Sequence, residues 1–107
     1  MRCYISLPIK DKEDTVKSRY EKAVAMLNSN GIHDVTGPHN IDEFDYNGYF
    51  GDTTLTWEHH LVRDLDEIDK CDAILMTDGW KYSPGCRLEL EYAEYHGKII
   101  LYTDGSI

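Results

Sequence analysis

The sequence predicts a three-layer α/β/α fold, with helices on both faces of a mostly parallel sheet of four strands, or of five. Two observations lead to this fold class. Strand-like and helix-like segments alternate along the 107 residues. The strand-like segments are also continuously apolar, as in sheets that are buried on both faces. A chain of this length forms a single domain, residues 1–107, and buries enough surface to fold without disulfide bonds.

The first half of the chain supplies two strands and one helix. Residues 3–7 form a short apolar run that Pro8 ends, which is typical of a buried strand. Residues 14–28 carry apolar side chains at helical spacing, and Asn30-Gly31 provides a C-terminal cap. Residues 32–36 then predict a weaker second strand.

A long irregular segment follows at residues 37–53, with three Gly, one Pro and several aromatic residues among acidic ones. Loops of this length are uncommon in compact domains and often serve as lids or binding loops. Two interpretations stay open. The aromatic side chains either cover a flat ligand or fasten the loop to the body of the protein; they are Phe44, Tyr46, Tyr49 and Phe50.

The second half repeats the alternation with two helices and two strands. An amphipathic helix is predicted from the spacing of Trp57, Leu61, Leu65 and Ile68, and residues 71–77 are the clearest buried strand. Ser83-Pro84 then begins a helix, with Ser as the N-cap and Pro at its first position. This helix runs to about residue 96, and residues 98–102 form the last strand.

This order of elements is that of flavodoxin-like and Rossmann-like folds. Ligands of such sheets bind beyond the carboxyl ends of the strands. Three segments are therefore expected to converge there: residues 7–12, residues 77–85 and the long loop.

Composition excludes several classes of partner. The net charge of −9 disfavours binding to nucleic acid polymers and to anionic membranes. We expect no signal peptide and no transmembrane segment. The three cysteines lack CxxC spacing, so we expect reduced thiols in a cytoplasmic protein and no structural zinc. The histidines lack metal-ligand spacing, and no common NAD, ATP or acyl-transfer motif is present; no metal or cofactor is expected.

The helix that begins at Ser83 holds the first candidate for chemistry. Counting from that N-cap puts Glu89 in the second turn, where the positive helix end is expected to favour the ionised form that a nucleophile needs. Gly85 would let a ligand approach the backbone. Two alternatives remain open: acids near a helix start simply stabilise it, and Glu91 is the functional acid if the register differs.

Asp64 and Tyr4 are the second and third candidates. Asp64 lies late in its predicted helix, where an acid is mildly unfavourable, so its presence there points to a function. The alternative is that it lies on a solvated face of the helix. Tyr4 lies inside the first predicted strand. A buried Tyr hydroxyl needs a partner, which is either a carboxylate across the crevice or a nearby carbonyl.

Taken together, these residues give the chain a family likeness. It resembles the nucleoside 2-deoxyribosyltransferase superfamily, and within it a small bacterial and phage-type branch of uncharacterised function. The resemblance runs almost end to end. It depends on residues 4–9, on Asp64 eight residues before Asp72, and on residues 72–80 ending in Gly79-Trp80. Its strongest part is Ser83-x-Gly85-x-x-x-Glu89 followed by Tyr92-Ala93.

The resemblance implies roles for these positions. Glu89 would attack the anomeric carbon of a 2′-deoxynucleoside or its 5′-monophosphate and form a glycosyl-enzyme ester. Tyr4 would orient Glu89, and Asp64 would help the base leave as a general acid. The implied partners are small nucleosides or nucleotides and further copies of the chain, as a homodimer or higher homo-oligomer. The residues implied in substrate binding are Ser6, Ile9, Lys10, Trp80, Ser83 and Gly85.

Two departures from the family pattern keep other functions open. Leu7 and Pro8 replace the small residues usual after the first strand, and the chain ends after its fourth predicted strand, where family enzymes continue. The alternatives are a non-catalytic nucleotide-binding or sensing module of the same fold, and a glycohydrolase that acts on NAD-like ribosylated ligands.

Overall fold

The computed structural model describes residues 1–9, 15–38 and 57–103, and for residues 57–60 the backbone alone. Within these ranges the chain forms four strands, three α-helices and one short 3₁₀ helix. In chain order they are β1 (Arg2–Ser6), α1 (Val16–Ser29), β2 (Asp34–Thr36), α3 (Trp57–Asp69), β3 (Ala73–Met76), η3 (Trp80–Tyr82), α4 (Pro84–Tyr95) and β4 (Ile99–Tyr102).

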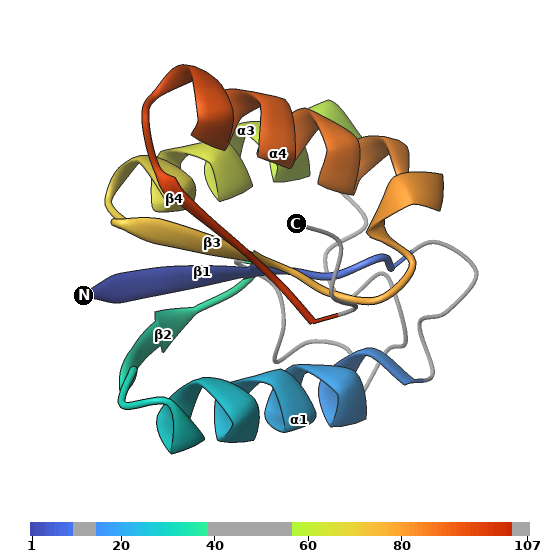
Figure 1. The fold of residues 1–107 in the computed structure, drawn as a ribbon. Helices are drawn as coiled ribbons and strands as arrows, with labels where there is room; N and C mark the ends of the chain where they lie inside the picture. Colours follow the sequence, from blue (N-terminus) through green and yellow to red (C-terminus); the bar gives the residue numbers. More distant parts are fainter. Residues whose placement is uncertain (10–14, 39–56, 104–107) are drawn as a thin grey trace.

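The four strands form one parallel sheet in the order β2-β1-β3-β4. Helix α1 covers one face of this sheet, and α3 and α4 lie side by side over the other (Figure 1). The predicted three-layer α/β/α class is therefore confirmed, with four strands among the described residues. The long loop predicted at residues 37–53 lies outside the described residues from residue 39 onward.

Two apolar cores lie on opposite faces of the sheet because successive strand residues point to opposite sides. In β1, Cys3 and Ile5 belong to the core under α1, whereas Tyr4 belongs to the core under α3 and α4. Strand β3 divides in the same way: Ile74 and Met76 face α3 and α4. Residues that are even-numbered in β1 and β3 therefore share the face on which α4 packs.

The helix ends follow the expected cap residues. Ser83 is the N-cap of α4 and its side chain accepts a hydrogen bond from the backbone N–H of Cys86, with Pro84 at the first helical position. Helix α1 ends at the Asn30 cap, after which Gly31 takes a positive φ of 82°. Only glycine adopts this conformation without strain, which explains why the helix stops there.

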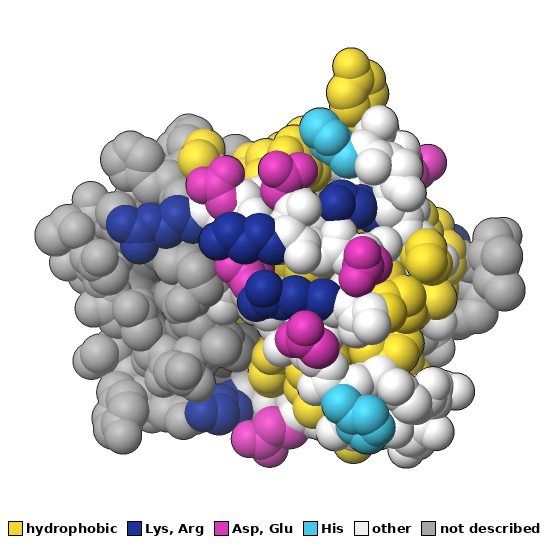
Figure 2. Space-filling model, turned by 90° about the vertical axis from the view of Figure 1, so that its left-hand side faces the viewer, with side chains coloured by type: hydrophobic (Ala, Val, Ile, Leu, Met, Phe, Trp, Pro, Cys, Tyr) yellow, Lys and Arg dark blue, Asp and Glu magenta, His cyan; other side chains and the backbone are white. Residues whose placement is uncertain are grey.

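Charged side chains of both signs gather at the amino ends of the strands, on the side shown in Figure 2. The Arg2 guanidinium forms an ion pair of 2.6 Å with Glu67 and a longer one of 3.7 Å with Asp34. The backbone N–H of Arg2 donates to Asp72. These contacts connect β1 to β2, to α3 and to the start of β3, at the end of the sheet opposite to Ser6 and Met76. None of the described helices is both long enough and apolar enough to cross a bilayer.

Candidate functional site

Glu89 occupies a core position of helix α4. The face of α4 that packs on the sheet carries Cys86, Glu89, Leu90 and Ala93, all of them buried. This is an apolar stripe at helical spacing in which one position holds a carboxyl group. Only 5% of the surface of Glu89 is exposed. A buried acid requires hydrogen-bond partners, because an isolated charge in the interior is strongly destabilising.

Strand β1 supplies those partners. The Tyr4 hydroxyl donates to Oε2 of Glu89 at 2.8 Å, and the Ser6 hydroxyl donates to Oε1 at 2.6 Å. Tyr4 and Ser6 are two residues apart in the same strand, so both side chains point to the face on which α4 packs. Of the two partners proposed for the Tyr4 hydroxyl, the structure gives it the carboxyl group of Glu89 and not a backbone carbonyl.

The electrostatics of Glu89 differ from the expectation. Burial, together with the nearby charge of Asp64, raises the pKa of Glu89 from 4.5 to about 8, although the hydrogen bonds from Ser6 and Tyr4 lower it. The helix end was expected to favour the ionised form. Glu89 does lie in the second turn of α4, but the influence of a helix terminus falls off within the first turn. Desolvation therefore dominates, and Glu89 is mainly protonated at neutral pH.

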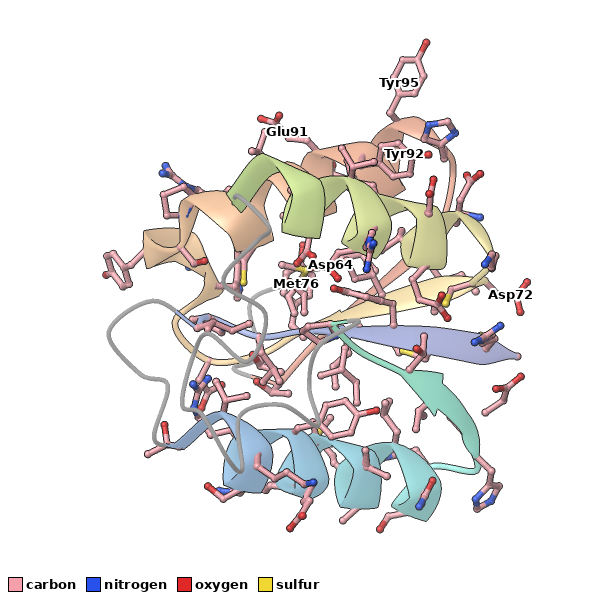
Figure 3. All side chains as sticks on the ribbon, turned by 180° about the vertical axis from the view of Figure 1, so that it is seen from behind. Asp64, Asp72, Met76, Glu91, Tyr92 and Tyr95 are labelled. Atoms are coloured by element: carbon pink, nitrogen blue, oxygen red, sulfur yellow. The ribbon has the colours of Figure 1, made fainter. Side chains whose placement is uncertain are left out.

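Asp64 lies on the same side of the sheet as Glu89. It is buried, and it lies between α3 and the sheet (Figure 3). Its charge acts on both Glu89 and Tyr4. Asp64 therefore is not one of the solvated acids of its helix, in contrast to its exposed neighbour Asp66. Asp72 lies at the opposite end of the sheet (Figure 3) and accepts the backbone N–H of Arg2.

The Tyr4 hydroxyl is protonated in this environment. Burial, the charges of Glu89 and Asp64, and the hydrogen bond to Glu89 all raise the pKa of Tyr4 well above 10. A hydroxyl that keeps its proton remains a hydrogen-bond donor at every physiological pH. Tyr4 is therefore suited to hold a carboxylate and not to act as a base.

The alternative acid Glu91 is placed elsewhere. Glu91 is exposed and points away from the sheet (Figure 3), whereas Glu89, two residues earlier, points toward it. The helical register thus gives Glu89, and not Glu91, the contacts with β1.

The residues expected to bind substrate lie in several different segments of the chain. Ser83 and Gly85 lie at the start of α4, and Ser83 caps it. Trp80 lies in η3 after β3, where its ring contacts that of Tyr102 at a centroid distance of 5.6 Å. Ile9 is half-buried beyond the end of β1. Lys10 lies outside the described residues.

Sequence reasoning missed the contact between Ser6 and Glu89. Ser6 was expected to bind substrate, but its side chain is fully buried and its hydroxyl donates to the carboxyl group. A signal was present: Ser6 is the one small polar residue in an apolar strand, and it shares a face with Tyr4. The carboxyl ends of β1 and β3 meet, since both the backbone N–H and the hydroxyl of Thr77 donate to the carbonyl of Ser6.

Comparison with known proteins gives a family. The model of the domain of unknown function DUF4406 matches residues 1–102, and no curated protein matches the sequence. The matched range includes every described strand and helix, and with them Tyr4, Ser6, Asp64 and Glu89. The chain therefore belongs to the DUF4406 family.

Proposed function

We propose that this protein cleaves or transfers the N-glycosidic bond of a 2′-deoxynucleoside or of its 5′-monophosphate, with Glu89 as the nucleophile. The observation that carries the proposal is the buried Glu89 carboxyl held by two hydroxyl donors beside a second carboxylate, Asp64. Enzymes that cleave glycosidic bonds through a covalent intermediate typically use two acidic groups in different environments.

The first half of the reaction forms an ester. One oxygen of the ionised Glu89 forms a bond to C1′ of the sugar, and the bond between C1′ and the base nitrogen breaks. The electron pair of that bond goes to the base. The proton that Glu89 gives up on ionising passes to Asp64, which acts as the general acid and delivers it to the leaving base. Tyr4 keeps the Glu89 side chain oriented through the 2.8 Å hydrogen bond.

The second half regenerates the enzyme. Water, or the nitrogen of a second base, forms a bond to C1′, and the ester bond to Glu89 breaks with its electron pair returning to the carboxylate. The proton released by the incoming group goes to Asp64. Water as acceptor makes the protein a hydrolase, and a base as acceptor makes it a transferase. The sugar keeps its anomeric configuration in both cases because two displacements occur at the same carbon.

The raised pKa of Glu89 gives this mechanism a pH dependence. The reaction starts with one proton on the pair of Glu89 and Asp64, and this proton is present below the pKa of Glu89 of about 8 and lost above it. For the free enzyme, kcat/KM is therefore expected to stay level up to a pH of about 8 and to fall above it.

The test is a base-release assay. Purified protein is incubated with deoxynucleosides, ribonucleosides, NAD and the 5′-monophosphates, with and without an acceptor base, and free base is measured by chromatography. Glu89→Gln is expected to lower the rate by ~10³-fold or more, since the nucleophile is lost. Glu91→Gln is the matched control: the same substitution on the same helix, but at an exposed position.

Each outcome separates the alternatives. Base release that Glu89→Gln abolishes and Glu91→Gln retains supports the proposal. Release from ribosylated substrates alone indicates a glycohydrolase acting on NAD-like ligands. Thermal stabilisation by a nucleotide with no base release from any member of the panel indicates a binding module and overturns the enzymatic proposal.

A further inference from the structure

We propose that Ser6 is a positioning residue that holds Oε1 of Glu89 and stabilises its carboxylate form, so that Tyr4 and Ser6 together fix the rotation of this side chain. The catalytic meaning of this inference depends on the proposed function, because Glu89 is its nucleophile. The structural part stands on the 2.6 Å hydrogen bond from the Ser6 hydroxyl to Glu89.

Backbone contacts at the end of strand β1 fix the position from which the Ser6 hydroxyl points toward Glu89. The carbonyl oxygen of Ser6 accepts two hydrogen bonds from Thr77, one from the backbone N–H at 3.2 Å and one from the hydroxyl at 2.7 Å. Ser6 also pairs with Met76 in the parallel ladder. The backbone of Ser6 is thus fixed on the side of β3, and the direction of its side chain follows from the pleat of the strand.

Two hydrogen bonds, one to each oxygen of Glu89, restrict the rotation of its carboxyl group more than one bond does. A carboxyl group held only at Oε2 by Tyr4 can still rotate about its terminal torsion, which is soft in glutamate. The second bond at Oε1 removes that freedom. Both hydroxyls also donate to the ionised form, and hydrogen bonds to a charged group are stronger than those between neutral groups.

The charged and titratable groups that face Glu89 among the described residues are few. Strand β1 presents Tyr4, α3 presents Asp64, and α4 itself presents Cys86, whereas Met76 of β3 does not titrate. Burial raises the pKa of Cys86 to about 11, so its thiol is neutral at physiological pH. Asp64 disfavours the carboxylate form of Glu89, and Ser6 and Tyr4 favour it.

Removing the Ser6 hydroxyl is therefore expected to make Glu89 harder to ionise. The loss of one hydrogen bond to a carboxylate corresponds to a rise of about one pH unit in its titration midpoint, or an approximately tenfold smaller ionised fraction below that midpoint. A side chain with a purely structural role would leave this midpoint unchanged.

The experiment follows the carboxyl carbon of Glu89 directly by ¹³C NMR on protein labelled at glutamate, with the signal assigned by its absence in Glu89→Gln. Wild type, Ser6→Ala and Ser29→Ala are titrated over the same pH range. Ser29→Ala is the matched control, because Ser29 is exposed and its hydroxyl donates to the carbonyl of Ala25 at the far end of α1. The same spectra report whether each variant is folded, and Ser6→Cys, with a weaker donor, replaces Ser6→Ala if the latter does not fold.

A midpoint about one pH unit higher in Ser6→Ala, with Ser29→Ala unchanged, is the expected result. Ser6→Cys is expected to lie between wild type and Ser6→Ala. Equal midpoints in Ser6→Ala and wild type overturn the inference. Because this readout needs no substrate, a negative base-release assay refutes the proposed function and leaves the test of Ser6 intact. Where base release is found, the alkaline limb of kcat/KM is expected to move with the NMR midpoint.

Discussion

Replacing Glu89 by glutamine is expected to stabilise the fold. Glutamine keeps the shape of the side chain but never ionises, and the hydroxyls of Tyr4 and Ser6 can each donate to or accept from its amide. The wild-type carboxyl, in contrast, is buried beside Asp64, which makes its ionisation unfavourable.

The magnitude follows from the two pKa values of Glu89. The folded value of about 8 and the ordinary value of 4.5 differ by about 3.5, and at ~1.4 kcal/mol for each pKa unit this difference corresponds to roughly 5 kcal/mol.

The sign follows from where the proton is held. Below pH 4.5 Glu89 is protonated in both the folded and the unfolded wild-type chain, so it does not lower the free energy of unfolding. Between 4.5 and about 8 the unfolded chain releases this proton while the folded chain retains it, so the free energy of unfolding falls as pH rises. Above a pH of about 8 Glu89 is ionised in both states, and the free energy of unfolding falls no further on its account.

The assay is urea unfolding of wild type, Glu89→Gln and Glu91→Gln from about pH 5 to about pH 9. Titration of the groups that do not interact with Glu89 cancels in the difference between variants. The stability of Glu89→Gln relative to wild type is expected to grow by about 1.4 kcal/mol per pH unit and to level off near pH 8. Glu91 is exposed, so the Glu91→Gln curve should run parallel to that of wild type. A constant difference between Glu89→Gln and wild type across this range would refute the buried, protonated state of Glu89.

Two further predictions concern the fold around the site. Ser83→Ala removes the cap of α4 and is expected to lower the free energy of unfolding by about 1 kcal/mol, whereas Ser83→Asp retains a cap; equal urea midpoints for wild type and Ser83→Ala would contradict this. The three cysteines are buried and burial raises the pKa of each thiol, to about 12 for Cys3 and about 11 for Cys71 and Cys86. Thiol reagents should therefore modify them only as fast as the protein opens, and rapid labelling of the native protein would contradict their burial.

The fold class could be predicted because local signals agree with the tertiary arrangement. Ala73–Met76 is apolar throughout and forms a strand buried on both faces. The Ser83-Pro84 pair marks the start of α4, and Gly31 marks the end of α1. The order of the strands, β2-β1-β3-β4, was not predicted and comes from the structure.

The site could be predicted in part. Tyr4, Asp64 and Glu89 were named from the sequence, and the structure brings them together on one face of the sheet. The charge state of Glu89 could not be predicted, because it depends on burial by α3, α4 and the sheet, which no local pattern contains. The contact of Ser6 with Glu89 could not be predicted either, because it depends on how α4 packs against β1.

The most direct test of Glu89 as the nucleophile is a search for the glycosyl-enzyme itself. Wild-type protein is mixed with a deoxynucleoside that releases base, quenched in acid, and examined by mass spectrometry of the intact chain and of its peptides. The proposed mechanism predicts one deoxyribosyl group on the peptide that contains Glu89, present in Glu91→Gln and absent in Glu89→Gln. An adduct on another residue, or base release that Glu89→Gln retains in full without any adduct, would contradict it.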